Sequence, residues 1–411
     1  MEEAKEVMLV GEGSPIKVGH MINGKYKSFL RNYYLSSSLY DFVFAYAIYN
    51  VLFNIRGLSV FEISLLLAWW ALTSVILEIP SGALADYWSR KKMLVIAPMI
   101  KSLCFVTWFF ANGDFYLYAL GFLFWSIGSS LVSGTTEALL YDELTAFDKK
   151  EEYEKTLGKK KFYFHIALAV SIISGGFIAH YNLDWALIFS VIPLLFSAFF
   201  ALLIRETPKA KSTEEVRYLE HIKAAYEEIK HNKMLVYLFI YAVGISIFGG
   251  IEEFDQLYYQ LAKLPIFAFG IVGFIWSVSS SIGSYFAYKL KNTHWIYYGL
   301  PFFGFVLMLL VGLFPSIPMI ALLLLSYFIT SPLVVLIDSK IQHNIKSISR
   351  ATVTSVDHLL INLSGVILAP LFGLIGTIWN LQAIYITTAI FLLLFTVWTL
   401  IKRKVFIQSK V

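Results

Sequence analysis

Residues 61–112 read FEISLLLAWWALTSVILEIPSGALADYWSRKKMLVIAPMIKSLCFVTWFFAN, two long apolar runs on either side of a short basic segment. An α-helix needs about 20 mostly apolar residues to cross the hydrocarbon core of a bilayer, and both runs are long enough. A transmembrane β-strand would be shorter and would alternate strictly between apolar and polar residues, and neither run does so. The stretch therefore predicts two membrane-spanning helices joined by a basic loop.

The rest of the chain repeats this pattern. Its 411 residues are 58% hydrophobic and 15% charged, whereas about 25% of the residues of a soluble domain are charged, so lipid must cover part of the surface. We expect an all-α membrane protein with twelve transmembrane helices. The apolar runs lie at residues 32–54, 61–84, 93–112, 115–140, 162–181, 185–204, 234–258, 266–288, 295–314, 317–337, 353–376 and 380–401.

Lysine and arginine residues sort onto one side of these spans. Thirty of the 33 lie in the N-terminal arm, the C-terminal tail and alternate loops, whereas Arg56 and Lys263 lie on the other side and Lys101 within the third span. Because basic residues collect in cytoplasmic loops, we expect a multi-pass protein of the plasma (inner) membrane with both termini cytoplasmic. This sorting explains the net charge of +5, so the expected partners are the lipid bilayer and a small-molecule substrate, and not nucleic acid.

The longest break between spans covers residues 205–232 and has six spans on each side. Apolar residues recur at helical spacing from Val216 to Ile229, which predicts an amphipathic helix on the membrane surface. We therefore expect an N-terminal six-helix bundle over residues 1–204, a cytoplasmic linker over 205–232 and a C-terminal six-helix bundle over 233–411, in a monomeric protein. Docking of a partner by the linker helix is an alternative to a simple connecting role.

The basic loop after the second span, GALADYWSRKK at residues 82–92, resembles the G-x-L-A-D-x-x-G-R-K/R signature of the major facilitator superfamily, with Ser89 in place of the second glycine. The stretches SGTTEALLYDEL (133–144) and RATVTSVDHLL (350–360) resemble further signatures of a branch that contains efflux-type permeases. The resemblance covers the whole chain. It implies the major facilitator fold, in which two six-helix bundles rock about a central site to move a solute across the membrane.

The resemblance also implies a gate at the cytoplasmic side. In the family, the aspartate of this loop motif faces the start of the eleventh helix and holds the outward-open state together. The matching residues here, with Asp142 or Glu143 as the acidic partner from the fourth helix, are Gly82, Asp86, Arg90, Asp142 and Arg350.

Departures from the proton-antiporter patterns of the family accompany these matches. Ser171 and Ile172 occupy the Gly-Pro positions of the fifth-helix motif, and Trp125 stands where a fourth-helix arginine is usual. Ala287 stands where the equivalent loop of the second half would carry an aspartate. The resemblance by itself therefore does not imply proton antiport.

Ionisable side chains at membrane depth are costly, which makes them candidates for function. Asp41, near the middle of the first span, can take up and release a proton, bind a cationic group of the substrate, or simply bond to its helix neighbours. Glu78 and Lys101 lie at similar depths on adjacent helices, which predicts a structural ion pair. The further candidates for proton coupling or substrate binding are Glu137, Asp338, Asp357 and His358.

Aromatic and amide side chains of several spans are suited to an amphipathic cavity for an organic solute. The candidates are Tyr40, Phe44, Asn50, Trp125, Tyr241, Gln256 and Asn362. At the outer end of the seventh span, Glu252, Glu253 and Asp255 are candidates for an extracellular gate or for attracting cations, with a solvated helix end as the alternative.

The sequence carries no Walker loop, no glycine-rich dinucleotide turn and no metal-ligand spacing. We therefore expect no cofactor, no metal and no enzymatic activity, and an ion gradient as the source of energy. The first interpretation is proton-coupled efflux of a small amphipathic drug or metabolite through Asp41 and Glu137. The alternatives are proton-coupled uptake of a small metabolite or metal chelate, and a transporter-like receptor or scaffold.

Overall fold

The computed structural model describes residues 15–207, 230, 232–290, 293–344 and 350–403. Within those ranges it describes all side chains except those of residues 15–23, 79, 82–83, 85–87 and 350–358. The expected linker helix falls largely outside the described residues, and the expected division into domains stays a prediction.

The described part of the chain is helical and contains no strand. Twelve of its helical segments are long and apolar enough to cross a membrane, which confirms the expected number of spans. The elements are α1 (Pro15–Tyr40), η1 (Phe44–Ala47), α2 (Tyr49–Ile55), α3 (Val60–Tyr87), α4 (Arg90–Ala111), α5 (Phe115–Val132), α6 (Thr135–Ala146), η2 (Lys150–Glu152), α7 (Tyr153–Tyr181), α8 (Leu183–Leu202), α10 (Lys233–Ile245), α11 (Ile247–Glu252), α12 (Asp255–Leu261), α13 (Ile266–Tyr285), α14 (Ala287–Leu290), α15 (Ile296–Leu313), α16 (Ile317–Asn344), α17 (Arg350–Ile378) and α18 (Leu381–Ile401).

Three helices extend well past the apolar runs that predicted them, and α1 begins at Pro15 instead of residue 32. The fifth span was expected from residue 162, but α7 begins at Tyr153, and α16 continues to Asn344 instead of ending near residue 337. Lysine side chains on such extensions can lay their methylene stems along the helix and keep the charged group in water. Hydropathy therefore marks only the part of each helix that lies in the hydrocarbon core.

The first span is broken, which the sequence analysis did not predict. α1 ends at Tyr40, residues 41–43 are not helical, and the chain resumes as η1 and α2. In a membrane, backbone groups freed by such a break need new partners. Here Ser190 of α8 supplies one, because its hydroxyl oxygen accepts a hydrogen bond of 3.1 Å from the backbone N–H of Ala45. The seventh span is broken in the same way, into α10, α11 and α12.

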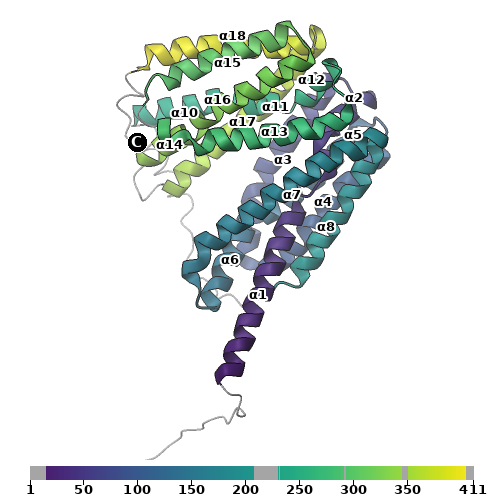
Figure 1. Ribbon diagram of the computed structural model, residues 1–411, viewed down its shortest axis with the longest axis vertical. Helices are drawn as coiled ribbons and strands as arrows, with labels where there is room; N and C mark the ends of the chain where they lie inside the picture. Colours follow the sequence, from purple (N-terminus) through teal and green to yellow (C-terminus); the bar gives the residue numbers. More distant parts are fainter. Residues whose placement is uncertain (1–14, 208–229, 231, 291–292, 345–349, 404–411) are drawn as a thin grey trace, which may run out of the picture.

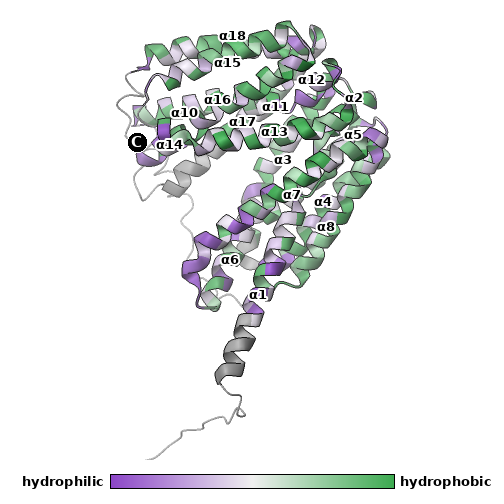
Figure 2. Ribbon diagram, viewed as in Figure 1, coloured by the Kyte–Doolittle hydropathy of each residue, from purple (hydrophilic) through white to green (hydrophobic). Residues whose placement is uncertain are grey.

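The helices pack in two groups, α1 to α8 and α10 to α18 (Figure 1). The groups converge at the right of Figure 1 and diverge toward its left, where α6 lies apart from α14. We call the end near residues 88–89, 147–152 and 203–207 the basic end, and the opposite end, near residues 56–59 and 262–265, the closed end. Figure 2 shows hydrophilic residues gathered at the basic end of α6 and α7, whereas the middles of the helices are hydrophobic.

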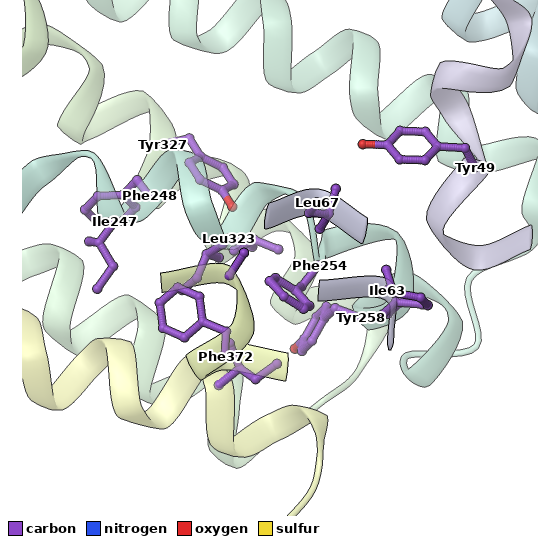
Figure 3. Packing of buried hydrophobic residues seen from close by; sticks show 14 of the residues in the cluster. Tyr49, Ile63, Leu67, Ile247, Phe248, Phe254, Tyr258, Leu323, Tyr327 and Phe372 are labelled. Atoms are coloured by element: carbon purple, nitrogen blue, oxygen red, sulfur yellow. The ribbon is translucent and has the colours of Figure 1, made fainter. Parts of the chain in front are cut away.

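At the closed end, α3 packs against α17 and α7 against α13. Glycines permit these close approaches, as between other membrane helices. A Cβ atom on Gly176 of α7 would lie 2.8 Å from the Phe267 carbonyl oxygen and 2.9 Å from the Gly270 nitrogen of α13. Figure 3 shows the apolar filling between the groups, with Phe254 between Leu67 of α3 and Phe372 of α17.

Candidate functional site

Asp41 lies at the break of the first span and forms an ion pair with Lys101 of α4. The Lys101 Nζ is 2.6 Å from Asp41 Oδ1, and it also donates to the Tyr46 hydroxyl oxygen at 2.9 Å and to the Tyr40 carbonyl at 3.4 Å. The Tyr46 hydroxyl in turn donates to Asp41 Oδ1 at 2.7 Å. The Lys101 side chain is 1% exposed and the Asp41 side chain 25%. A buried ammonium is tolerated only when it is paired and hydrogen-bonded in this way.

Aromatic rings surround the Lys101 ammonium. Its Nζ lies 4.2 Å from the centroid of the Tyr40 ring and 5.4 Å from that of Trp125, and the Tyr46 ring stacks on Trp125 at 5.2 Å. Both distances allow a cation–π interaction, which is stronger where water is excluded. Trp125 stands where the family pattern has an arginine. In this chain the cation at that place comes from α4 instead.

The expected ion pair between Glu78 and Lys101 is wrong. Lys101 pairs with Asp41, and Glu78 lies exposed on α3. The position of a residue in an apolar run indicates its depth in the membrane, but it does not indicate which face of the helix the side chain occupies. The unpredicted break after Tyr40 is what carries the Asp41 carboxylate to α4.

A cavity of about 320 Å³ within the first group of helices reaches Asp41. Asp41 and Tyr40 lie at one part of its wall, and Lys160, Lys161 and His165 of α7 lie at another. The wall also carries hydroxyl groups and apolar side chains, namely Ser36, Ser197, Thr136, Leu94, Val132 and Phe164. The cavity is therefore amphipathic and has ionisable groups along its length.

Glu137 of α6 is paired with a lysine that lines this cavity. Its carboxylate forms an ion pair of 2.6 Å with the Lys160 ammonium, and the Lys160 side chain is 15% exposed. Both acidic residues that were assigned to proton coupling, Asp41 and Glu137, thus have a lysine partner that single-sequence reasoning did not identify.

Arg90 of the loop motif connects the start of α4 to α6. Its guanidinium forms an ion pair with Asp142 and donates a hydrogen bond of 3.0 Å to the Ala138 carbonyl. Ser89 caps α4 by accepting a hydrogen bond of 3.1 Å from the Lys92 N–H, which gives a local reason for serine where the family has glycine. Glu206 accepts hydrogen bonds from the Ser89 hydroxyl and, at 2.6 Å, from the Arg90 N–H, and nothing in the sequence indicated this role.

The side chains of the other members of the expected gate lie outside the described part of the structure, and so the role of the gate stays a prediction. α3 contains Gly82 and Asp86, and α17 begins at Arg350, but their side chains are not described. The side chains of Asp357 and His358 are likewise outside the described part.

A hydrogen-bonded bridge joins the two groups of helices at the closed end. The Tyr49 hydroxyl donates to the Glu253 carboxylate, and Asn50 Nδ2 donates to the Glu253 carbonyl at 2.7 Å. Gln256 accepts from the Asn50 N–H at 3.0 Å and donates to the Tyr46 carbonyl at 2.8 Å. We call these five residues the bridge. The Phe61 N–H, which donates to the Thr377 hydroxyl at 3.1 Å, joins the two groups at the same end.

Three of the expected cavity residues lie elsewhere than in a cavity wall, two of them in the bridge. Asn50 is 1% exposed and bonded across the groups, and Gln256 is its partner, so both close the protein instead of lining a cavity. Tyr241 is fully buried, and its hydroxyl donates to the Tyr297 carbonyl at 3.0 Å, which makes it a core residue. A residue type that suits a cavity wall suits a packed interface equally well.

The remaining candidates are spread over the molecule. Phe44 lies in η1, with its carbonyl against Gly175 of α7, while Asn362 and Asp338 are exposed on α17 and α16.

Asp255 is not part of a solvated helix end, because it is 3% exposed and accepts hydrogen bonds from Tyr327 at 2.8 Å and Tyr385 at 3.0 Å. The structure thus gathers Tyr40, Asp41 and Trp125 around Lys101, and leaves the others elsewhere.

Comparisons with known proteins agree with this architecture. A model of the Major Facilitator Superfamily matches residues 33–356. A comparison with curated protein sequences gives no match. Among solved structures, a variant of the nucleoside transporter NupG has a TM-score of 0.75 at 14% identity, over 92% of this chain and 99% of that one. At this identity, the likeness shows the fold.

Two further solved structures were captured in inward-directed states. A bacterial homolog of the human lysosomal transporter Spinster, inward-facing and unoccupied, has a TM-score of 0.73 at 16% identity, over 97% of this chain and 99% of that one. The xylose transporter XylE from E. coli, in an inward open conformation, has a TM-score of 0.63 at 13% identity, over 93% and 96% of the two chains.

Proposed function

Because this chain belongs to the major facilitator superfamily, and is thus a multi-pass membrane transporter and not an enzyme, we propose that it exports a small amphipathic solute in exchange for protons. The superfamily assignment gives transport of a small molecule. The direction, the proton coupling and the residues involved are our proposal, and they are argued from the ion pair, the cavity and the bridge.

The arrangement of the helices fits a state that is open to the cytoplasm. Hydrogen bonds and close helix packing join the two groups at the closed end, and the groups diverge toward the basic end. Since basic residues face the cytoplasm, we place the basic end, with both termini, inside the cell and the protein in the plasma (inner) membrane. Two solved structures of the same fold carry the corresponding description, inward-facing for one and inward open for the other.

The observation that supports coupling most strongly is the ion pair of Asp41 and Lys101 at the break of the first span. Asp41 is the partly exposed member of the pair and borders the cavity, so a proton can reach it. Protonation removes the charge that holds Lys101, and in a low-dielectric environment this favours a rearrangement of the groups around the ammonium. Tyr46 connects the ion pair to the bridge, because its hydroxyl donates a hydrogen bond to Asp41 and its carbonyl accepts one from Gln256. A rearrangement at Asp41 is therefore expected to disturb the bridge.

The same contacts argue against Asp41 as a binding site for a cationic drug. The Lys101 ammonium already occupies the carboxylate at 2.6 Å. A cationic substrate would have to displace a buried, hydrogen-bonded lysine, which leaves an uncompensated charge in the protein interior. We therefore assign Asp41 to the proton and not to the substrate.

Inverted membrane vesicles test the direction and the coupling. We expect at least one probe from a panel of uridine, xylose, dialanine, 4-phenylbutyrate and ethidium to accumulate when the vesicle interior is acidified, and to leak out when the gradient is dissipated. Vesicles without the protein serve as the control. Gradient-driven accumulation in right-side-out vesicles would instead make the protein an importer, and binding without movement would make it a receptor.

A further inference from the structure

The cavity of about 320 Å³ beside Asp41 has a charge distribution that selects among solutes. From it we infer that the transported solute is a small organic anion, a carboxylate with an apolar body, which places its anionic group against Lys161 and His165. This inference rests on the proposed function, because it names the substrate class of the same protein.

The charges of the cavity wall do not balance. Lys101 neutralises Asp41, and Glu137 neutralises Lys160, each across 2.6 Å. Lys161 lines the cavity and forms no ion pair within the described part of the chain. The wall thus keeps one lysine charge without a counter-charge, and the ring nitrogens of His165, one helical turn away, add polar groups to the same part of the wall. An anion in the cavity therefore meets a favourable potential from Lys161, and a cation meets an unfavourable one.

The position of Lys161 supports a role in binding over one in folding. Its side chain is exposed, whereas Lys160 on the same turn is held by Glu137. An exposed lysine stays hydrated until a ligand binds, and little free energy is needed to reorient its side chain toward the ligand. The lining of the cavity includes Ile204, at the basic end, as well as Asp41, and we infer that the solute enters from that end.

Apolar side chains on the wall indicate the rest of the ligand. Leu94, Val132 and Phe164 contribute apolar surface next to the hydroxyl groups of Ser36 and Thr136. The volume is near the lower end of the roughly 300–1,000 Å³ that is typical of small-molecule pockets, which favours a compact solute. A carboxylate on a small aromatic or branched body matches this combination of size, polarity and charge.

Equilibrium binding separates this inference from simple size selection. The full-length protein, in nanodiscs of uncharged lipid, is titrated with 4-phenylbutyrate, benzoate and 4-hydroxybenzoate, each beside its neutral amide, and with 4-phenylbutylamine. At least one carboxylate is expected to bind about tenfold more tightly than its amide, and 4-phenylbutylamine is expected to bind most weakly. If no carboxylate exceeds its amide, or if the amine binds best, the inference is wrong.

A matched pair of lysine variants locates the contact. Lys161→Gln is expected to weaken carboxylate binding about tenfold and to leave amide binding unchanged. Lys159→Gln removes an exposed charge two residues away that does not line the cavity, and it is expected to change neither. Equal effects of the two variants would mean that only the general field of the basic end matters, which would overturn the assignment to Lys161.

Anionic lipid headgroups carry a related negative charge and can reach the basic end. Nanodiscs with anionic phosphatidylglycerol distinguish this source from a soluble carboxylate. If Lys161→Gln changes phosphatidylglycerol binding but not carboxylate binding, the residue anchors the protein to lipid, and the inference fails. Binding needs no gradient, so the two proposals can fail separately. If carboxylates bind but are not transported, the proposed function is wrong and this inference stands. If only uncharged solutes are transported, this inference is wrong and the proposed function stands.

Discussion

Replacement of Asp41 by leucine is expected to lower the free energy of unfolding by about 3 kcal/mol. Removal of one partner of a buried ion pair costs about 3–5 kcal/mol, because the other charge stays buried without compensation. The lower end of that range applies because the Asp41 side chain is 25% exposed, although Lys101 is 1% exposed. Denaturant titration of the protein in detergent micelles measures the loss.

The double variant Asp41→Leu/Lys101→Met provides the decisive comparison. With both charges gone, the site becomes apolar, and replacement of a buried pair by apolar side chains is often neutral or stabilising. We therefore expect the double variant to regain most of the stability that Asp41→Leu loses. Lys92→Met, an exposed lysine on the same helix α4, serves as the control and should change little. Additive losses in the double variant would show that the two side chains do not interact.

Replacement of Tyr49 by phenylalanine is expected to weaken the bridge and shift the protein away from the form that is shut at the closed end. The change removes only the hydroxyl that donates to the Glu253 carboxylate. A hydrogen bond to a charged group contributes about 1.5–3 kcal/mol, which corresponds to a shift of roughly ten- to a hundredfold in the equilibrium between the two forms. The bonds of Asn50 and Gln256 remain, so the protein should still fold.

Distance measurements between spin labels report this shift. Labels replace Ile55 at the end of α2 and Leu261 at the end of α12, which are 49% and 41% exposed and belong to different helix groups. Cys104 is buried and should stay unlabelled. Tyr49→Phe should add a population with a longer distance, whereas Tyr116→Phe, at an 80% exposed tyrosine, should not. An unchanged distance distribution in Tyr49→Phe would remove the bridge from the account.

The spans of this protein follow from its sequence, but their interruptions do not. Long apolar runs leave few alternatives to a helix in the membrane, because every backbone group must be satisfied within the chain. The break at residues 41–43 carries no proline and no glycine, and it depends on the hydroxyl of Ser190, which comes from a helix far along the chain. Such a tertiary hydrogen bond leaves no local signal in the sequence.

The sequence predicts which ionisable residues belong to the candidate site, but it does not predict which of them form an ion pair. The depth of Asp41 and Lys101 in apolar runs marked both as costly and therefore as candidates. Which of them meet depends on the rotation of each helix and on the break after Tyr40, and hydropathy reports neither. For the same reason the sequence does not show that Tyr241 packs in the core or that Glu206 accepts a hydrogen bond from the Arg90 N–H.

In the proposed mechanism, Asp41 couples the movement of the solute to protons. Asp41→Asn in proteoliposomes tests it most directly, because asparagine keeps an oxygen that can accept a hydrogen bond from Lys101 but does not take up a proton. Two rates are compared, namely solute exchange without a gradient and solute accumulation driven by a pH gradient. We predict that exchange persists while gradient-driven accumulation is lost, and that Asp148→Asn, at an exposed residue of the basic end, retains both. Accumulation by Asp41→Asn at the rate of the unmodified protein would contradict the account.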